Sequence, residues 1–186
     1  MNDKRAPAHD EHHRTLVLDD HALQAAATSN LDDGAVTPAF AEHRDDIIAL
    51  LNDALATELV CVLRYKRHHF TAHGLSSPAI ASEFMVHANE EAGHADQIAR
   101  RIVQLGGEPD FAPDSLSARS HADYDTSSDL KAMVRANLVA ERIAVEAYRQ
   151  MITLIGDKDP TTRRMLEGIL ADEEEHADEL KDLLEQ

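Results

Sequence analysis

The amino-acid sequence predicts an all-α protein, folded as an antiparallel four-helix bundle with one long connection between its second and third helices. Aromatic residues make up only 4% of the chain and Trp is absent, which favours packed helices over a sheet sandwich. Apolar residues recur at helical spacing over four long segments. Gly and Pro residues separate these segments, as expected where one helix ends and the next begins.

The first two predicted helices form a tight hairpin. One runs from about residue 40 to 72 and is stopped by Gly74. Ser77 followed by Pro78 is a cap and first-turn signal for the next helix, which runs to the glycine pair at 106–107. The short turn between them makes the two helices antiparallel neighbours.

A long connection and a second hairpin follow. Residues 107–127 contain prolines and many small polar residues without helical periodicity, so we expect them to cross along the side of the bundle. The third helix begins after a Ser or Asp cap near Ser128 and ends at Gly156. Asp159 and Pro160 then open the fourth helix, which continues almost to the last residue.

One bundle domain is expected after a short arm. The 186 residues are enough for a single sizeable core. Residues 1–38 are polar and are predicted to form a partly flexible N-terminal arm, and residues 39–186 to form the bundle. A solvated arm is the simplest interpretation, although its four histidines offer possible metal ligands: His9, His12, His13 and His21.

Charge and composition limit the classes of partner. The formal net charge of −17 opposes phosphate backbones and attracts small cations, which predicts metal ions as partners and no direct binding of nucleic acid. No apolar run is long enough to span a membrane. The single cysteine, Cys61, cannot form an intrachain disulfide, and the N-terminal segment lacks the apolar core of a signal peptide. A cytoplasmic location is therefore expected.

The two predicted hairpins resemble each other in sequence. ATELVCVLRY at 56–65 parallels VAERIAVEAY at 139–148, and EEAGHAD at 90–96 parallels EEEHAD at 173–178. In each half a Tyr follows the first Glu by seven residues, and a His follows the second Glu by three. The sequence therefore indicates a duplicated hairpin whose two halves would be related by a pseudo-twofold axis.

Six potential metal ligands lie on the apolar stripes of the four predicted helices: Glu58, Glu91, His94, Glu141, Glu173 and His176. Residues three apart on a helix share a face, so each Glu and His pair can converge on one point. Four buried carboxylates would unfold the bundle or take up protons unless cations compensated them. Two divalent cations would balance the four charges, which is the pattern of a carboxylate-bridged di-metal site in a four-helix bundle.

The types of ligand indicate which metals are expected. Carboxylates with a few imidazoles suit iron or manganese, and the absence of thiolate ligands argues against a structural zinc site. The competing interpretation is that these residues are ion-paired or exposed on ordinary amphipathic helices. That interpretation does not explain why the same residue types fall in the same order on all four helices.

The same residues resemble those of the ferritin-like superfamily, most closely bacterioferritin and the bacterioferritin-like Dps proteins. The resemblance covers roughly residues 40–186, through Glu58 with Tyr65, EEAGHAD at 90–96, Glu141, and ILADEEEHADEL at 169–180. It implies a di-iron ferroxidase centre that oxidises Fe(II) with O2 or H2O2, with manganese or zinc as substitute metals. It also implies storage of a ferric mineral inside a hollow cage of identical subunits.

The resemblance further implies a role for each ligand. Comparison with bacterioferritin gives Glu58 and Glu141 as terminal ligands and Glu91 and Glu173 as bridges, with one His for each iron. Tyr65 is expected near the metals, where it would donate an electron or hydrogen-bond a ligand. Ordinary core packing is the alternative role for this tyrosine.

Three departures from the family pattern modify these expectations. Ala92 follows Glu91 where bacterioferritin has its haem-ligating Met, so haem binding is not predicted. The chain ends ten residues after His176, without the fifth helix of bacterioferritin, which favours a 12-subunit over a 24-subunit cage. Dps-like proteins with this ligand set often carry a cysteine pair, whereas Cys61 stands alone and is expected to be a small buried residue.

Several neighbouring residues have secondary interpretations. Asn137 is either a hydrogen-bond partner of His94 or a surface amide, and His87 is a candidate extension of the site or of an iron path. Tyr148 has a weaker claim to the site than Tyr65. Interaction with the helix dipole explains the histidines at the end of the first helix: His68, His69 and His73. Three acids beside the ligands are expected to be solvated or to guide cations: Glu90, Glu174 and Glu175.

Iron storage or detoxification is the function that these expectations favour. The alternative is a discrete di-iron or di-manganese redox enzyme, such as a rubrerythrin-like peroxidase or a catalase. The chain lacks the paired cysteines of a rubredoxin module. Direct DNA protection is disfavoured by the acidic arm and the overall charge.

Overall fold

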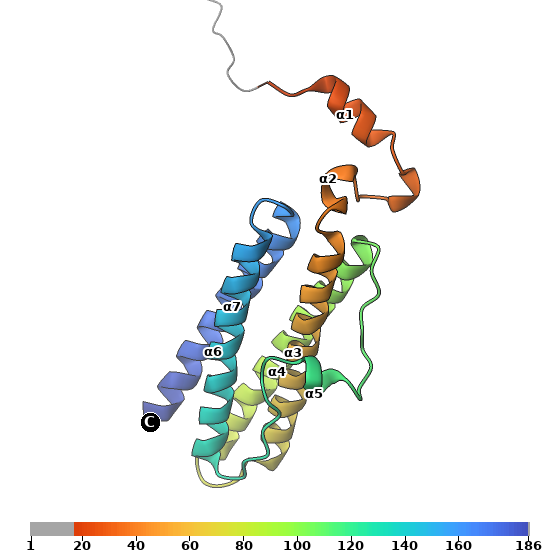
Figure 1. Cartoon of the computed structure of the whole chain (residues 1–186). Coiled ribbons are helices and arrows are strands. Elements are labelled where there is room, and N and C mark those ends of the chain that lie inside the picture. The colour runs from red at the N-terminus through yellow and green to blue at the C-terminus, as the bar shows by residue number, and fades with distance from the viewer. Residues whose placement is uncertain (1–16, 186) are drawn as a thin grey trace, which may run out of the picture.

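The computed structural model describes residues 17–185, and four long helices dominate it (Figure 1). They are α3 (Arg44–Thr71), α4 (Ser77–Gln104), α6 (Leu130–Ile155) and α7 (Pro160–Glu185). The shorter elements are α1 (Asp20–Ala27), the 3-10 helix η1 (Leu31–Asp33), α2 (Pro38–Ala41) and α5 (Leu116–Arg119). The predicted all-α four-helix bundle is confirmed, and the described residues contain no strand.

The helices of the bundle are antiparallel to their neighbours. Short turns join α3 to α4 and α6 to α7, so each pair is a hairpin. Between the hairpins, His94 of α4 meets Asp172 of α7, whereas the earlier His87 meets the later Glu179. Helices α4 and α7 therefore run in opposite directions along this contact, which brings corresponding turns of the duplicated halves face to face.

The connection between the hairpins runs along α3 from one end of the bundle to the other (Figure 1). At its start, Asn52 Nδ2 donates to the carbonyl of Glu108 over 3.2 Å. Near its end, Arg67 donates to the carbonyls of Thr126 and Ser127, each over 2.8 Å. The predicted crossover is confirmed, but it contains the one-turn helix α5, which the prediction lacked because a single turn is too short to show a period.

The helix ends follow local capping chemistry with small shifts from the prediction. Asp129 caps α6 by accepting a hydrogen bond from the backbone N–H of Ala132 over 2.9 Å. The cap of α4 is Ser76 rather than Ser77, whose hydroxyl instead donates to the carbonyl of Gly74 over 2.8 Å. Gly156 ends α6 at φ 51°, in the left-handed region that favours glycine.

The segment before the bundle is separate from the first long helix. Figure 1 shows α1 beyond the end of the bundle at which α3 begins, and α1 has no buried residue. The helix predicted from about residue 40 is divided into α2 and α3, while the arm boundary at 38/39 stays a prediction. His21 is exposed on α1, and the other arm histidines lie outside the described residues: His9, His12 and His13.

The two largest apolar clusters of the core lie toward opposite ends of the bundle. One includes Leu51, Leu55 and Ile102, and the other includes Phe84 and Leu180. The turns of all four long helices between these clusters carry buried polar side chains. Cys61 is 2% exposed, in agreement with the expectation of a buried residue. Among residues 17–185, no helix is long and apolar enough to cross a membrane.

A buried ion pair fixes the start of α7. Arg101 of α4 donates to both carboxylate oxygens of Asp159, over 2.9 and 2.8 Å. Asp159 also accepts the backbone N–H of Thr162 over 3.0 Å, which caps the helix. Burial opposes ionisation, but the hydrogen bonds from Thr162 and Arg101 outweigh it and lower the pKa of Asp159.

The Asp159→Ala variant should lose about 3 kcal/mol of stability, because the buried Arg101 would be left without its partner. The lowered pKa means that the aspartate stabilises the fold above its unfolded pKa of about 3.9 and loses this contribution as the pH falls further. Urea unfolding at neutral pH measures the loss. Asp157→Ala is the control, since the Asp157 side chain is 98% exposed; equal midpoints for the two variants would contradict the prediction.

Candidate metal centre

The six predicted ligand residues meet in one buried layer across the middle of the bundle. Each residue is at most 4% exposed: Glu58 from α3, Glu91 and His94 from α4, Glu141 from α6, and Glu173 and His176 from α7. Apolar residues lie on both sides of the layer along the bundle axis. The helical spacing that placed these residues on apolar stripes therefore located the layer correctly.

The layer consists of two groups of four side chains. The first is Glu58, Glu91, His94 and Glu173, and the second is Glu91, Glu141, Glu173 and His176. Within each group the ligand atoms lie within 4.8 Å of one another. Two glutamates belong to both groups, as a bridged pair of cations would require.

Each histidine directs one ring nitrogen into its own group. His94 Nδ1 lies 3.1 Å from Glu173 Oε1 and 3.5 Å from Glu58 Oε2. His176 Nδ1 lies 3.6 Å from Glu91 Oε1 and 3.9 Å from Glu173 Oε2. The pseudo-twofold relation expected from the repeat is therefore present in the side-chain geometry.

Seven buried atoms of this layer have no hydrogen-bond partner among the described residues. They are both carboxylate oxygens of Glu173, Oε2 of Glu58 and Glu141, Oε1 of Glu91, and Nδ1 of His94 and His176. A buried polar atom without a partner costs about 1–3 kcal/mol. Carboxylate oxygens and imidazole nitrogens suit iron, manganese or zinc, so divalent cations fit the atoms that the protein leaves without partners.

Burial and crowding shift the pKa values of the layer. Burial, together with the charge of Glu91, raises the pKa of Glu58 to about 8. Burial also raises the pKa values of Glu141 and Glu173 above their usual range. For His176, burial acts to lower the pKa, but contacts with Glu91 outweigh it and raise the value to about 9. Without metal, the layer holds protons near neutral pH that bound cations would replace.

Two carboxylates at the edge of the layer contact the outer ring nitrogens of His94 and His176. His176 Nε2 lies 3.0 Å from Glu90 Oε2, and His94 Nε2 lies 3.1 Å from Asp172 Oδ2. When Nε2–H donates to the carboxylate, Nδ1 keeps its lone pair toward the layer, as a metal ligand requires. The Glu90 side chain is 49% exposed, in agreement with the prediction of a solvated residue, but its contact with His176 was not predicted.

The sequence analysis also missed Asp172, although the internal repeat contains a signal for it. Glu90 and Asp172 each directly precede one of the two shared glutamates, Glu91 and Glu173. Both contacts pass between α4 and α7. An acidic residue at equivalent positions of the two halves indicates the same role in both.

The Asp172→Ala variant is expected to bind metal 10–100-fold more weakly, roughly the effect of removing a carboxylate that orients a ligating histidine. The fold should not change, since the Asp172 side chain is 56% exposed. Titration calorimetry with Zn(II) measures the affinity, and Glu174→Ala, at an exposed position two residues further on, is the matched control. Wild-type affinity in the Asp172 variant would show that this contact does not orient His94.

The two tyrosines of the repeat occupy equivalent positions. The Tyr65 hydroxyl donates to Glu141 Oε1, and the Tyr148 hydroxyl donates to Glu58 Oε1. Each contact leaves the second oxygen of that glutamate without a partner in the layer. The expectation that Tyr148 has the weaker claim is therefore wrong: each tyrosine orients one glutamate that belongs to a single group.

Asn137 lies in a different network from the predicted one. It is fully buried and accepts a hydrogen bond from Arg64 Nε over 2.8 Å, while its amide faces His68 Nδ1 at 3.1 Å. His68 Nε2 in turn lies 3.1 Å from Asp125 of the crossover. Asn137 is therefore neither a partner of His94 nor a surface amide, and buried contacts rather than the helix dipole account for His68.

Two antiparallel hairpins joined by a long crossover, with a central layer of paired carboxylates and histidines, define a ferritin-like bundle. Residues 48–186 match the family described as Ferritin-like domain, and the chain belongs to this family. This match begins just inside α3 and covers the four long helices and the crossover. The resemblance inferred from the motifs is confirmed.

Proteins similar to this chain include bacterioferritins and Dps proteins. The bacterioferritin of Desulfovibrio desulfuricans is 27% identical over 136 residues, which cover 73% of this chain and 72% of the relative. The nutrient stress-induced DNA-binding protein of a Synechococcus strain is 30% identical over 132 residues, 68% of this chain and 74% of the relative. A similar solved structure is that of a bacterioferritin-related protein from Bacteroides fragilis, a dodecameric thioferritin. It superimposes with a TM-score of 0.73 at 33% sequence identity, and the match covers 76% of this chain and 85% of that chain.

Proposed function

We propose that this protein is a ferroxidase and iron store. In this proposal the buried layer binds two Fe(II) ions as substrate, O2 or H2O2 oxidises them, and the ferric product accumulates as mineral inside a cage of identical subunits. The observation that carries the proposal is the set of unpartnered carboxylate and imidazole atoms in two groups that share Glu91 and Glu173. A bound di-iron pair would supply the electrons for reduction of the oxidant.

The position of each residue in the layer determines the role that we propose for it. Glu91 and Glu173 lie in both groups and would bridge the ions, whereas Glu58 and Glu141 would each bind one ion. Tyr148 and Tyr65 orient these two terminal glutamates. Metal binding would release carboxyl protons, so it is expected to be favoured at higher pH.

A dodecameric cage is the assembly that we propose for this chain. Support comes from the Bacteroides fragilis relative, which is a dodecamer and matches this chain over 76% of its length. Iron storage needs an enclosed volume, which a single four-helix bundle does not provide. Storage of the mineral, unlike oxidation at the layer, therefore depends on the proposed assembly.

Particle mass and iron content together test the function. Light scattering before and after aerobic Fe(II) loading gives the subunit number, and an iron assay gives the iron retained per chain. A dodecamer that retains far more iron than a di-metal centre can hold is the expected result. A small oligomer with metal only at the stoichiometry of the centre would contradict storage and favour the discrete redox enzyme.

DNA binding is not part of the proposed function. One relative is a DNA-binding protein by name, but the net charge of −17 opposes contact with phosphates. We expect no mobility shift of duplex DNA at moderate salt. Tight binding in that assay would contradict the expectation.

A further inference from the structure

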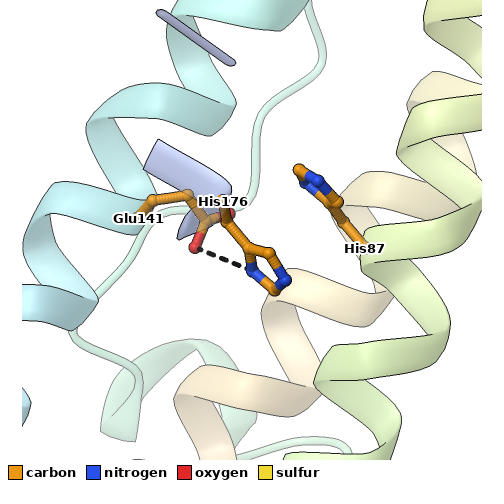
Figure 2. A group of neighbouring side chains, drawn as sticks. All are labelled: His87, Glu141 and His176. Carbon is orange, nitrogen blue, oxygen red and sulfur yellow. Dashed lines mark ion pairs between the residues drawn. The ribbon is translucent and has the colours of Figure 1, made fainter. Parts of the chain in front are cut away.

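His87 lies beside the proposed di-iron centre but belongs to neither of its two groups. Its ring stacks on that of His176, with centroids 4.2 Å apart and planes inclined by 19°. Figure 2 shows His87 across from Glu141 and His176, and its ligand atom lies within 4.8 Å of theirs. The side chain is fully buried, so each of its ring nitrogens needs a partner.

The inner nitrogen of His87 has its partner in Tyr65. His87 Nδ1 lies 3.0 Å from the Tyr65 hydroxyl, whose one hydrogen is donated to Glu141. The hydroxyl oxygen therefore accepts a hydrogen from His87 Nδ1. This direction rests on the proposed function, in which a bound cation keeps Glu141 ionised.

The outer nitrogen of His87 faces two carboxylates. His87 Nε2 lies 2.9 Å from Glu179 Oε2 of α7 and 3.6 Å from Glu83 Oε1, one turn earlier on α4. With Nδ1 carrying the hydrogen, the Nε2 lone pair points at two acceptor oxygens, which repel it. The three atoms therefore face one another as the ligands of a single cation would.

The surroundings favour a metal cation. Glu83 and Glu179 are partly exposed and line a cavity of about 200 Å³ between α4 and α7 that also reaches His176. Five acidic side chains line this cavity, and it contains no basic residue other than that histidine. Such a concentration of negative charge attracts cations from solvent.

We propose that Glu83, His87 and Glu179 form a third divalent-cation site next to the di-metal centre. One imidazole and two carboxylates suit a first-row transition metal such as Fe(II) or Zn(II), and solvent in the cavity would complete the coordination. The three ligand atoms already lie within 4.8 Å of one another. Through His87 and Tyr65, this cation is linked to the terminal glutamate Glu141 of the centre.

Equilibrium dialysis against Zn(II), which is not oxidised, tests the site in the intact protein. The double variant Glu83→Gln, Glu179→Gln should bind about one ion fewer per chain than the wild type, because the amides keep their size but lose their charge. Glu174→Gln combined with Asp178→Asn is the matched control, since it removes two nearby exposed charges that belong neither to the group nor to the cavity lining. Circular dichroism checks that each variant is folded.

The outcomes separate this proposal from the proposed function. A loss of one ion in the test variant and none in the control supports the third site, and ions that remain in the test variant report on the di-metal centre. Equal binding by wild type and test variant would overturn the third site. In Zn(II)-soaked crystals, we expect an anomalous peak about 2.1 Å from His87 Nε2, and its absence would also overturn the proposal.

Discussion

Replacing Glu173 with Gln should abolish rapid Fe(II) oxidation and at the same time raise the melting temperature of the metal-free protein. Glu173 belongs to both ligand groups, and neither of its carboxylate oxygens has a hydrogen-bond partner among the described residues. Removing a shared ligand affects both cations. We therefore expect the oxidation rate to fall by more than about 100-fold, beyond the 10–100-fold effects of partners outside the coordination shell.

The stability of the same variant should change in the opposite direction. Burial and the charges of Glu91 and Glu58 raise the pKa of Glu173, so its ionised form is disfavoured in the metal-free layer. A neutral amide of the same size avoids that cost, and the gain should be about 1–3 kcal/mol. Such opposite effects on stability and activity are typical of side chains retained for function.

Stopped-flow absorbance of Fe(III) formation and thermal unfolding of the metal-free protein measure the two effects. Glu174→Gln is the matched control, because it makes the same chemical change at the neighbouring exposed position. Both quantities should stay at their wild-type values in the control. A Glu173 variant that oxidises Fe(II) at the wild-type rate would exclude this glutamate from the centre.

Local signals made most of the fold predictable. The ends of α4, α6 and α7 lie within a residue or two of the glycines, prolines and capping residues that predicted them. The convergence of the six side chains also followed from helical spacing, because apolar residues on the same stripe fixed the direction of each Glu and His. Their role as metal ligands stays a prediction.

The features that the sequence analysis missed depend on contacts between elements. The pairing of His94 with Asp172 requires the rotation and register of α4 against α7, which no spacing within one helix specifies. The contacts of Asn137 with Arg64 and His68 likewise depend on how α6 lies against α3. The equal roles of Tyr65 and Tyr148 likewise depend on how α3 faces α6, because each hydroxyl donates to a glutamate of the other helix.

The metal-free protein should lose stability as the pH rises from about 5 to 9, and bound metal should abolish this loss. The pKa of Glu58 is raised from 4.5 to about 8, and that of His176 from 6.5 to about 9. A group with a raised pKa in the folded state stabilises the fold fully below its unfolded pKa and loses that contribution as the pH passes the folded value. Glu141 and Glu173 shift in the same direction.

Metal binding should have the opposite dependence on pH, because the cations displace the protons that stabilise the metal-free layer. At a free Zn(II) concentration of 100 times Kd, binding adds about 2.7 kcal/mol to the stability. Since affinity rises as the carboxyl groups ionise, the difference in melting temperature between Zn(II)-bound and metal-free protein should widen from pH 5 to pH 9. Calorimetric scans across this pH range measure the difference in melting temperature. The Glu173→Gln variant, which lacks a shared metal ligand, should not show this widening. A constant difference would mean that the buried layer does not exchange protons for metal.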